Sequence, residues 1–410
     1  MSDDPETRAA GDARRLLATR GARALVDGTV ATVLPAYLLA RGLRPSQVGA
    51  VITATLLGSA AVTLAVGLRG GHLDRVRLLR AIAVVMVLTG VAFGLAGSFV
   101  VLLIVGALGT VNPSGGDVSA FLPIEQSLLP ETVPAAARTH LFARYALVAA
   151  LAGAVGALAA GLPQLVAEHT GLSTLDALRL VFVAYAGAGV VILVLYRGLQ
   201  PRPPARLADG ARHGLDRSRA VVYRLAALFS IDAFGGGFAG QSILVLWLAL
   251  RFHLSTATAG AVFFWTGLLS ASSALLAPRI AARIGLIRTM VFTHLPANGL
   301  LMAAALMPTA PLAVACLLAR SLLSQMDVPA RTSYVMAVVD PEERAAAASL
   351  TNVPRSLASA LPPLLAGWLL ERSSFGWPLL VAGGLKIVYD LSLLRLFKDV
   401  RPPDEVAATT

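Results

Sequence analysis

The feature that most constrains this chain is a series of twelve apolar runs, each about 20 residues long, the length that an α-helix needs to cross the hydrocarbon core of a bilayer. Only 14% of the residues are charged and the mean hydropathy is +0.73, whereas soluble proteins carry roughly a quarter charged residues. The alternating strands of about ten residues that a β-barrel needs are not visible. The sequence therefore predicts an all-α membrane protein with twelve transmembrane helices.

The apolar runs fall into two groups of six, separated by one long polar segment. We expect spans near residues 22–41, 46–67, 81–97, 99–124, 141–163, 177–196, 224–250, 256–277, 287–307, 311–330, 345–369 and 376–397. The expected organisation is a cytoplasmic tail at 1–21, an N-terminal six-helix bundle at 22–196, a cytoplasmic linker at 197–221, a C-terminal six-helix bundle at 222–397 and a cytoplasmic tail at 398–410. The excess of arginine in the loops on one side predicts that both termini are cytoplasmic.

Charge and cysteine content argue against several other functions. The net charge is +11, but the arginines lie in short loops between apolar runs, which indicates membrane topology rather than nucleic-acid binding. The single cysteine, Cys316, excludes a disulfide framework and a multi-cysteine site, and no histidine pair has metal-site spacing, so no metal site is expected. No phosphate-binding loop or Gly-x-Ser-x-Gly elbow is present, which argues against an ATP-driven pump and against an enzyme.

The two halves also share an internal repeat. The segment Leu129–Gly161 is similar to Val339–Gly367. The residue pairs that match at a constant spacing of 211 (342 − 131) are Glu131 with Glu342, Arg144 with Arg355, and Gly156 with Gly367. The segments Leu43–Gly49 and Leu254–Gly260 match at the same spacing. A constant offset indicates a duplication, so we expect two pseudo-symmetric bundles with a ligand site between them, near the membrane midplane.

Three motifs resemble the major facilitator superfamily of secondary transporters. The loop after the second span contains Gly70, Asp74, Arg75, Arg77 and Arg80 in an order similar to the family's Gly-x-x-x-Asp-Arg-x-Gly-Arg-Arg signature. The first span, Leu25–Pro35, looks like the Leu-Asp-x-Thr…Leu-Pro pattern of drug-exporting members, and Glu131 with Arg138 matches a Glu-x6-Arg pattern. Arginine in the fourth span and Gly-Pro in the fifth, both typical of proton-coupled drug antiporters, are missing.

The resemblance implies a bacterial member similar to exporters of drugs or toxic compounds. Such a protein moves a small solute across the inner membrane by alternating access, as a multi-pass monomer surrounded by the lipid bilayer. It has no cofactor and draws its energy from an ion gradient, most simply of protons. The alternatives are an uptake or facilitative carrier of a small polar metabolite, and a receptor or scaffold that transports nothing.

We expect charged residues in the cytoplasmic loops to form a gate. Asp74, Arg75 and Arg77 are its first layer, with Asp74 opposite the start of the eleventh helix, near Glu342. The second layer is a ring of salt bridges made by Glu131, Arg138, Arg144, Glu342, Arg344 and Arg355. The alternative is that both layers are solvated loops whose arginines only set the topology.

Acidic residues inside the spans are the candidates for the transport pathway. Asp27 and Asp232 lie in the first helix of each half, where a carboxylate is costly unless it is paired or hydrated. Such acids predict a proton or cation site, unless they only pair with Arg23 or Arg224 at a hydrated helix end.

Helix breakers beside acids in the fourth and tenth spans suggest freed backbone groups that bind the substrate. The residues concerned are Asn112, Asp117, Asp327 and Arg331, with Gln241 in the seventh span. The alternative is a kink near the cytoplasm with solvated acids. Lys386 and Asp390, four residues apart in the twelfth span, are expected to neutralise each other as a structural pair.

Overall fold

A computed structural model describes residues 5–69, 74–114, 119–134, 137–200, 218–340 and 343–397, and these residues form helices and their connections. The N-terminal unit contains α1 (Pro5–Ala40), α2 (Pro45–Arg69), α3 (Arg75–Leu95), α4 (Phe99–Leu108), α5 (Leu122–Leu128), the 3-10 turn η2 (Leu129–Glu131), α6 (Arg138–Ala159), α7 (Leu162–Thr170) and α8 (Thr174–Arg197). The C-terminal unit contains α9 (Arg219–Gly237), α10 (Gln241–Phe252), α11 (Thr256–Ile284), α12 (Leu286–Leu306), α13 (Ala310–Ser321), α14 (Asp327–Ala337), α15 (Arg344–Ala360), α16 (Pro362–Arg372) and α17 (Trp377–Phe397).

These elements make the twelve expected spans, and several spans consist of two consecutive helices. Eight segments in the described chain are long and apolar enough to cross a membrane by length and composition. The other four spans are α4 with α5, α13 with α14, α15 with α16, and α17. The first three are broken into short pieces, and α17 carries three charged residues, Lys386, Asp390 and Arg395. Breaks and buried charges in otherwise apolar spans are typical of membrane proteins whose interior has a function.

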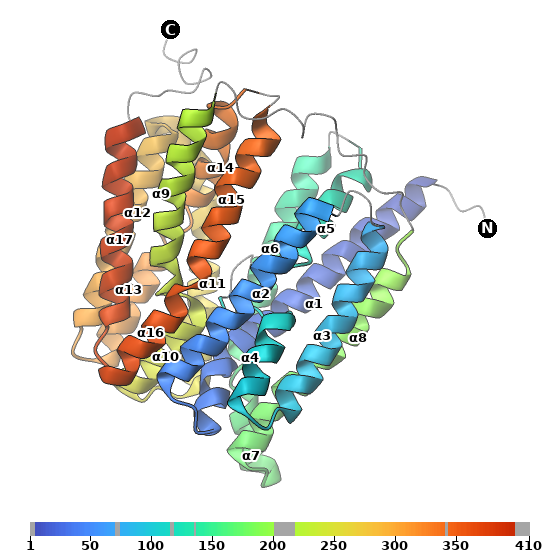
Figure 1. The fold of residues 1–410 in the computed structure, drawn as a ribbon, viewed down its shortest axis with the longest axis vertical. Coiled ribbons are helices and arrows are strands. Elements are labelled where there is room, and N and C mark those ends of the chain that lie inside the picture. The colour runs from blue at the N-terminus through green and yellow to red at the C-terminus, as the bar shows by residue number, and fades with distance from the viewer. Residues whose placement is uncertain are drawn as a thin grey trace.

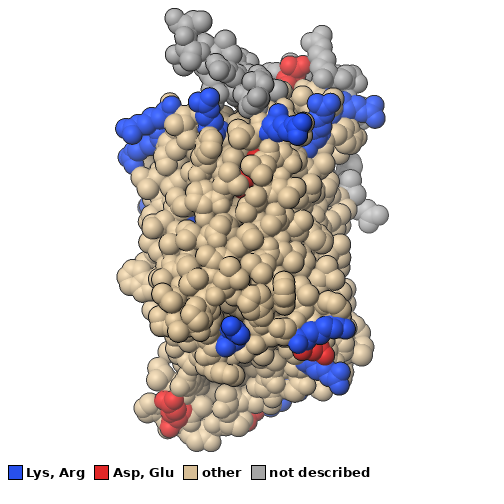
Figure 2. Space-filling model, turned by 90° about the vertical axis from the view of Figure 1, so that its left-hand side faces the viewer, with Lys and Arg blue, Asp and Glu red and all other residues tan. Residues whose placement is uncertain are grey.

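The surface of the molecule has the charge distribution of a multi-pass membrane protein. A broad apolar band separates charged residues at the two ends, and Lys and Arg are more numerous at the end where α17 finishes (Figure 2). We call this the terminal end, because α1 also begins there (Figure 1). Large apolar side chains that are exposed include Leu88, Leu108 and Leu275. Such side chains suit contact with lipid tails better than contact with water.

The first helix is longer than expected. Residues 1–21 were expected to be a tail that precedes the first span, but α1 starts at Pro5 and continues without interruption through that span. Leu16 and Thr19 are buried, as is the charged residue Asp12. This part of the chain is therefore a packed extension of the first span and not a separate tail, while its cytoplasmic location stays a prediction. Arginines and acids made the segment look polar, although one face of it packs into the N-terminal unit.

The two units contact each other through two matching helix pairs. Gly49 of α2 lies directly against the carbonyl of Pro363 and against Gly367 in α16, so closely that a side chain at Gly49 would collide with the backbone. In the other pair, Gly260 of α11 lies against the carbonyl of Ala157 in α6. Small residues allow this close backbone approach between membrane helices. The matching of Gly49 with Gly260 confirms the spacing of 211 for these two helices.

The spacing of 211 does not hold for the fifth and eleventh spans. Ala157 corresponds to Pro363 by its contact, which is a spacing of 206 (363 − 157). Arg138 and Arg344, also 206 apart (344 − 138), each donate from Nε to a backbone carbonyl eight residues earlier. The pairing of Arg144 with Arg355 and of Gly156 with Gly367 is therefore wrong. A constant offset assumes that both copies have the same length, and alanine-rich helices offer chance matches when they do not.

The contacts between the units lie in the middle and towards the end opposite the termini. Thr53 accepts a hydrogen bond from the amide of Leu364 (3.0 Å), and Ser242 donates to the carbonyl of Ala31 (2.7 Å). The amide of Ser46 donates to Glu371 at the far end (3.2 Å). Towards the terminal end, the ribbons of α14 and α15 diverge from those of α5 and α6 (Figure 1). The units are thus joined at one end of the molecule.

Candidate functional site

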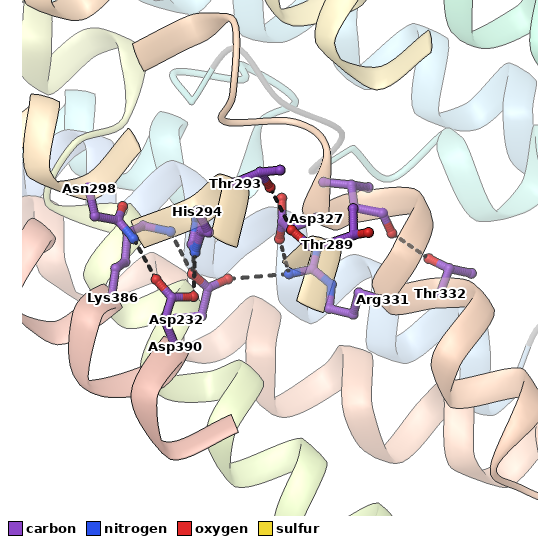
Figure 3. A network of polar contacts seen from close by, with 11 residues as sticks. Asp232, Thr289, Thr293, His294, Asn298, Asp327, Arg331, Thr332, Lys386 and Asp390 are labelled. Carbon is purple, nitrogen blue, oxygen red and sulfur yellow. Dashed lines mark hydrogen bonds and ion pairs between the residues drawn. The ribbon is translucent and has the colours of Figure 1, made fainter. Parts of the chain in front are cut away.

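A buried network of charges connects four helices of the C-terminal unit, with Asp232 of α9 at its centre (Figure 3). The side chain of Asp232 is only 5% exposed. Its Oδ1 accepts a hydrogen bond from Nζ of Lys386 (2.6 Å), and its Oδ2 accepts one from Nη1 of Arg331 (3.3 Å). The same Arg331 nitrogen also donates to Oδ2 of Asp327 (3.3 Å). Asp232, Asp327 and Arg331, which were predicted separately for the pathway, therefore form one cluster.

The network continues through α12. Nε2 of His294 lies 4.0 Å from Oδ1 of Asp232, and Nδ1 lies 2.9 Å from Oδ1 of Asp390. Asn298 donates to the other oxygen of Asp390 (3.0 Å). An imidazole between two carboxylates can hold or pass a proton, because its two nitrogens are distinct donor and acceptor sites. His294 and Asn298 face this network because they lie four residues apart on one face of α12.

The expected pair of Lys386 and Asp390 does not form. Lys386 donates to Asp232 of α9, and Asp390 is held by His294 and Asn298 of α12. The spacing of four residues correctly placed both side chains on one face of α17. That face, however, points into the unit, where each group finds a closer partner on another helix. The residues belong to the central charge network and are not an isolated structural pair.

The N-terminal unit contains a second buried network, centred on Glu125 of α5. Glu125 is 0% exposed and Arg23 of α1 is 1% exposed. Two nitrogens of Arg23 donate to the two carboxylate oxygens (2.6 and 3.1 Å). Thr19 (3.0 Å), Tyr196 (2.5 Å) and Tyr145 also donate to Glu125. Each carboxylate oxygen thus accepts more than one hydrogen bond, and the guanidinium of Arg23 neutralises the negative charge.

Asp27 lies one turn further along α1 and belongs to neither network. It is 8% exposed, and its Oδ1 is buried with no hydrogen-bond partner. Arg23 does not pair with Asp27, because Glu125 holds both of its terminal nitrogens. A buried carboxylate oxygen without a donor is costly, so its retention indicates a site that a proton or a ligand donor can satisfy.

The breaks in the fourth and seventh spans meet between the units. Gln241 and Ser242 at the start of α10 donate their amides to the carbonyls of Ser114 (3.5 Å) and Pro113 (3.2 Å). The side chain of Gln241 donates to Thr32 of α1 (2.9 Å), and Asn112 accepts from Ser114. Backbone groups that the broken helices free are therefore used across the interface. Asp117 lies outside the described residues.

The predicted gate residues lie in contacts within their own units. Asp74 accepts hydrogen bonds from the amides of Val76 and Arg77 and caps α3. No hydrogen bond or ion pair joins it to a described residue of the eleventh helix, because the first turn of its own helix satisfies the carboxylate. The predicted contact near Glu342 lies outside the described residues. Arg75 forms an ion pair with Glu131 (2.8 Å) and donates to the carbonyl of Ser127 (3.2 Å).

The predicted ring of salt bridges is not present as expected among the described residues. Arg138 and Arg344 bind carbonyls instead, at Pro130 (3.2 Å) and Met336 (2.9 Å). Arg144 is exposed and has no ion pair with any described residue. Arg355 is not in a loop at all, since it lies 11 residues into α15 (355 − 344). Glu342 lies outside the described residues.

A comparison with protein families decides the identity of the fold. The model described as Major Facilitator Superfamily matches residues 16–325, which is most of the chain. The chain belongs to the major facilitator superfamily. Membership agrees with the twelve-helix architecture and places the protein among membrane transporters, not enzymes.

Several relatives share the superfamily fold at low sequence identity. A bacterial homolog of the human lysosomal transporter Spinster, in an inward-facing and unoccupied conformation, has a TM-score of 0.72 at 16% identity, covering 98% of this chain and 100% of that chain. The nucleoside transporter NupG has a TM-score of 0.73 at 14% identity, covering 94% and 99%. An uncharacterized membrane protein of Saccharomyces cerevisiae is 25% identical over 429 residues, covering 96% of this chain and 95% of its own length.

The residues that hold the N-terminal network lie outside the superfamily motifs. Glu125 and Arg23 were not predicted as site residues. A signal was nevertheless present, because Glu125 is an acid between apolar residues (PIEQSLL) and Arg23 stands beside the first apolar run. A buried acid needs a partner, so each of the two predicts the other. Tyr145 and Tyr196 gave no signal, because tyrosine is common near the ends of membrane helices.

Proposed function

We propose that this superfamily member is a proton-coupled secondary transporter of a small solute, with Asp232 as the proton carrier. The observation that carries the proposal is the position of Asp232. One carboxylate, on α9, is shared by Lys386 of α17 and Arg331 of α14, and His294 of α12 stands beside it. A single proton on this carboxylate would weaken contacts between several helices at once.

The coupling follows from the loss of one negative charge. When Asp232 is ionised, it holds Lys386 and Arg331, and through them α17 and α14, against α9. When it is protonated, both cations lose a partner and those helices are free to shift. Alternating access needs an element with two arrangements whose balance a proton can change. His294, with Asp390 behind it, supplies a route for that proton.

Asp27 is proposed to face the solute. Its buried Oδ1 lacks a donor, and it lies in α1 next to Gly28, whose carbonyl is 3.5 Å from Nε2 of Gln241 in the opposite unit. A ligand donor or a second proton would satisfy this oxygen. The hydrogen bonds of Gln241 to α1 and of Asn112 within the broken fourth span place both residues beside the same interface.

The charged loops are proposed to close the terminal end in the other half of the cycle. In the present conformation the units are joined at the opposite end, and the loop residues Asp74, Arg75 and Glu131 bind within the N-terminal unit. On closure these charges would exchange their present partners for groups on the C-terminal unit. This supports an assignment of the present conformation as inward-facing, if the terminal end is cytoplasmic as the arginine distribution predicts.

Export of the solute from a bacterial cell, across the inner membrane, stays a prediction from the first-span residues Leu25–Pro35. Uptake of a small polar metabolite is the second candidate. One observation favours it, namely the excess of buried positive charge around Asp232, where Arg320 and Arg355 add to Lys386 and Arg331. A monomeric protein without a cofactor suits both candidates.

The proposal is tested with proteoliposomes that contain the pH-sensitive dye pyranine. A panel of small neutral, anionic and cationic solutes is added outside, and the internal pH is followed for the wild type and for Asp232→Asn. The wild type is expected to couple the movement of at least one solute to that of protons, and the variant is expected to lose the pH change. Undiminished proton movement in Asp232→Asn would remove Asp232 from the role of carrier.

A further inference from the structure

Two arginines in the C-terminal unit lack any partner in the described chain. Nε of Arg320 and Nε of Arg355 are buried without a hydrogen bond, and neither guanidinium forms an ion pair with a described residue. Both side chains are half-buried. A guanidinium always carries its charge and offers five donors, so leaving it unpaired inside a membrane protein is costly. Such an arrangement is retained where a ligand supplies the missing acceptor.

Both arginines lie near the middle of the membrane. Arg320 is 10 residues into α13 (320 − 310), or about 15 Å along its axis, and Arg355 is 11 residues into α15 (355 − 344), or about 16 Å. The hydrocarbon core is about 30 Å thick, so both groups are close to its midplane. Substrate sites of secondary transporters lie at this depth. Arginines that set the orientation of a membrane protein lie in the loops between spans. Arg320 and Arg355 lie too deep for that role.

The nearest carboxylates are already used. Asp232 and Asp327 act electrostatically on both arginines, but neither is hydrogen-bonded to them. Asp232 accepts from Lys386 and Arg331, and Asp327 accepts from Arg331. Arg331 itself lies within electrostatic range of Arg355, which adds repulsion between like charges.

The charges of the cluster do not balance. Its cations are Lys386, Arg331, Arg320 and Arg355, and its carboxylates are Asp232, Asp327 and Asp390. With His294 neutral, one positive charge remains, and a protonated His294 would add another. Counted in the same way, the buried charges of the N-terminal unit balance, because Arg20 and Arg23 stand with Asp27 and Glu125. The excess charge is thus a property of the C-terminal cluster and not of buried networks in this chain generally.

We propose that Arg320 and Arg355 bind the anionic group, a carboxylate or a phosphate, of the transported solute. The inference rests on the proposed transport function and names the substrate class for that site. The guanidinium fork matches the geometry of both groups, because each presents two oxygens to parallel donors. The two helices that carry the arginines, α13 and α15, both belong to the C-terminal unit, so the anion is held by that unit through its conformational change.

The proton and the anion then reinforce each other. Protonation of Asp232 leaves Lys386 and Arg331 less neutralised, which increases the positive charge that Arg320 and Arg355 present to an anion. By linkage, the bound anion favours the protonated state of Asp232 to the same extent. The two therefore cross the membrane together, which supports uptake driven by an inward proton gradient over export.

The first test needs no knowledge of the solute. Because Arg320 and Arg355 have no partner, Arg320→Met and Arg355→Met are expected to leave the unliganded protein as stable as the wild type or more so. Arg23→Met, which strands the buried Glu125, is expected to lower stability strongly. Stability is measured as the temperature at which half of the monodisperse protein is lost on size-exclusion chromatography. A loss in the Arg320 and Arg355 variants as large as in Arg23→Met would show that they serve the fold and overturn the inference.

The second test asks which solutes bind. The same melting temperature is measured with acetate, succinate, phosphate and glycerol phosphate, with glycerol and ribose as neutral solutes and choline as a cation, at constant ionic strength set with sodium chloride. At least one carboxylate or phosphate is expected to stabilise the wild type. Its apparent affinity should fall about tenfold or more in each arginine variant, since each removes charge-assisted hydrogen bonds. Arg144→Gln, at an exposed arginine of α6, is the matched control and should bind as the wild type does.

The outcomes separate this inference from the proposed function. An anion effect that persists in the Arg320→Met/Arg355→Met double variant overturns the inference, and so does a wild type that no anion stabilises. Proton-coupled movement of a neutral or cationic solute through Asp232 would leave the transport function intact while removing the anion site. Anion binding that is lost in the arginine variants, together with unchanged proton movement in Asp232→Asn, would keep the site and remove the proton carrier.

Discussion

The two halves of this transporter use buried charge in opposite ways at corresponding places. In the N-terminal unit, Arg23 of the first span pairs with Glu125 of the fourth. In the C-terminal unit, Asp232 of the seventh span pairs with Arg331 of the tenth. Glu125 and Arg331 are 206 positions apart (331 − 125), the same spacing that relates the fifth and eleventh spans by their contacts. Arg23 and Asp232 are 209 positions apart (232 − 23). Each half thus has an ion pair between its first and its fourth span, with acid and base exchanged.

The surroundings of the two pairs differ more than the pairs themselves. Glu125 accepts from an arginine, a threonine and two tyrosines and has no further carboxylate beside it. Asp232 shares its cations with Asp327 and stands beside His294 and two unpaired arginines. A buried carboxylate that accepts several hydrogen bonds, as Glu125 does, fixes one arrangement of helices even though Nε of Arg23 has no partner in the described chain. A cluster with two guanidinium groups that make no ion pair with a described residue can exchange partners. From this comparison we infer that the N-terminal pair serves the fold and propose that the C-terminal cluster serves the transport cycle.

The largest expected effect is on the stability of the N-terminal pair. Glu125→Ala leaves Arg23 buried without its carboxylate and removes the acceptor of Tyr145 and Tyr196. Breaking a buried ion pair in this way costs about 3–5 kcal/mol. We expect poor yield of folded protein and a large fall in melting temperature on size-exclusion chromatography. A variant as stable as the wild type would show that the pair is not a structural element.

A smaller effect is expected when Asp232 loses one of its two cations. Lys386→Met leaves Arg331 in place, so the expected cost is that of one charged hydrogen bond, about 1.5–3 kcal/mol. The double variant Asp232→Asn/Lys386→Met should recover part of that loss, because it also removes the negative charge that Lys386 neutralised. A double-mutant cycle of melting temperatures measures the coupling. Strictly additive losses would contradict a direct interaction between the two side chains.

The smallest effect on stability is expected at Asp74. At this residue, the capping of α3 and the proposed charge of the gate can be removed by different substitutions. Asn caps helices about as well as Asp, so Asp74→Asn should change stability by less than about 0.5 kcal/mol. The variant loses the negative charge, however, and transport in proteoliposomes should slow if that charge closes the terminal end. Asp74→Ala, which loses the cap as well, is the matched comparison. An unaltered transport rate in Asp74→Asn would rule out a charged gate at this residue.

The sequence was sufficient for the architecture and for part of the site. Length and hydropathy determine where a membrane span lies, so the twelve spans were predictable even though α15 and α16 are individually short. Charged residues inside apolar runs were also recognisable, so Asp232, Asp327 and Arg331 were all predicted as pathway residues. The structure shows that these three form one cluster. Partners were not predictable, because they depend on the rotation of each helix about its axis. Lys386 and Asp390 share a face of α17, but only packing shows that this face meets Asp232 and His294.

The sequence misplaced two further residues, Glu125 and Arg355, and each case has a physical cause. Glu125 lies in α5, beyond a break in the fourth span and one residue past the expected end of that span at 124, so it was not predicted as a site residue although it is completely buried. Arg355 was placed in a gate because the offset of 211 matched it with Arg144. Length differences between the two copies shift that offset to 206 in the fifth and eleventh spans, so the match was accidental. Contacts such as that of Ala157 with Gly260 are needed to set the correspondence.

The most direct test of the central claim compares Asp232→Asn with Glu125→Gln in the same two measurements, melting temperature and solute-driven proton movement. The account predicts that Asp232→Asn still yields folded protein, because its amide oxygen can accept from Lys386 and Arg331 keeps Asp327, and that this protein loses proton movement. It predicts that Glu125→Gln loses stability, while the protein that does fold still moves protons. The opposite result, with proton movement lost in folded Glu125→Gln and retained in Asp232→Asn, would contradict the assignment of structure to the N-terminal pair and of coupling to the C-terminal cluster.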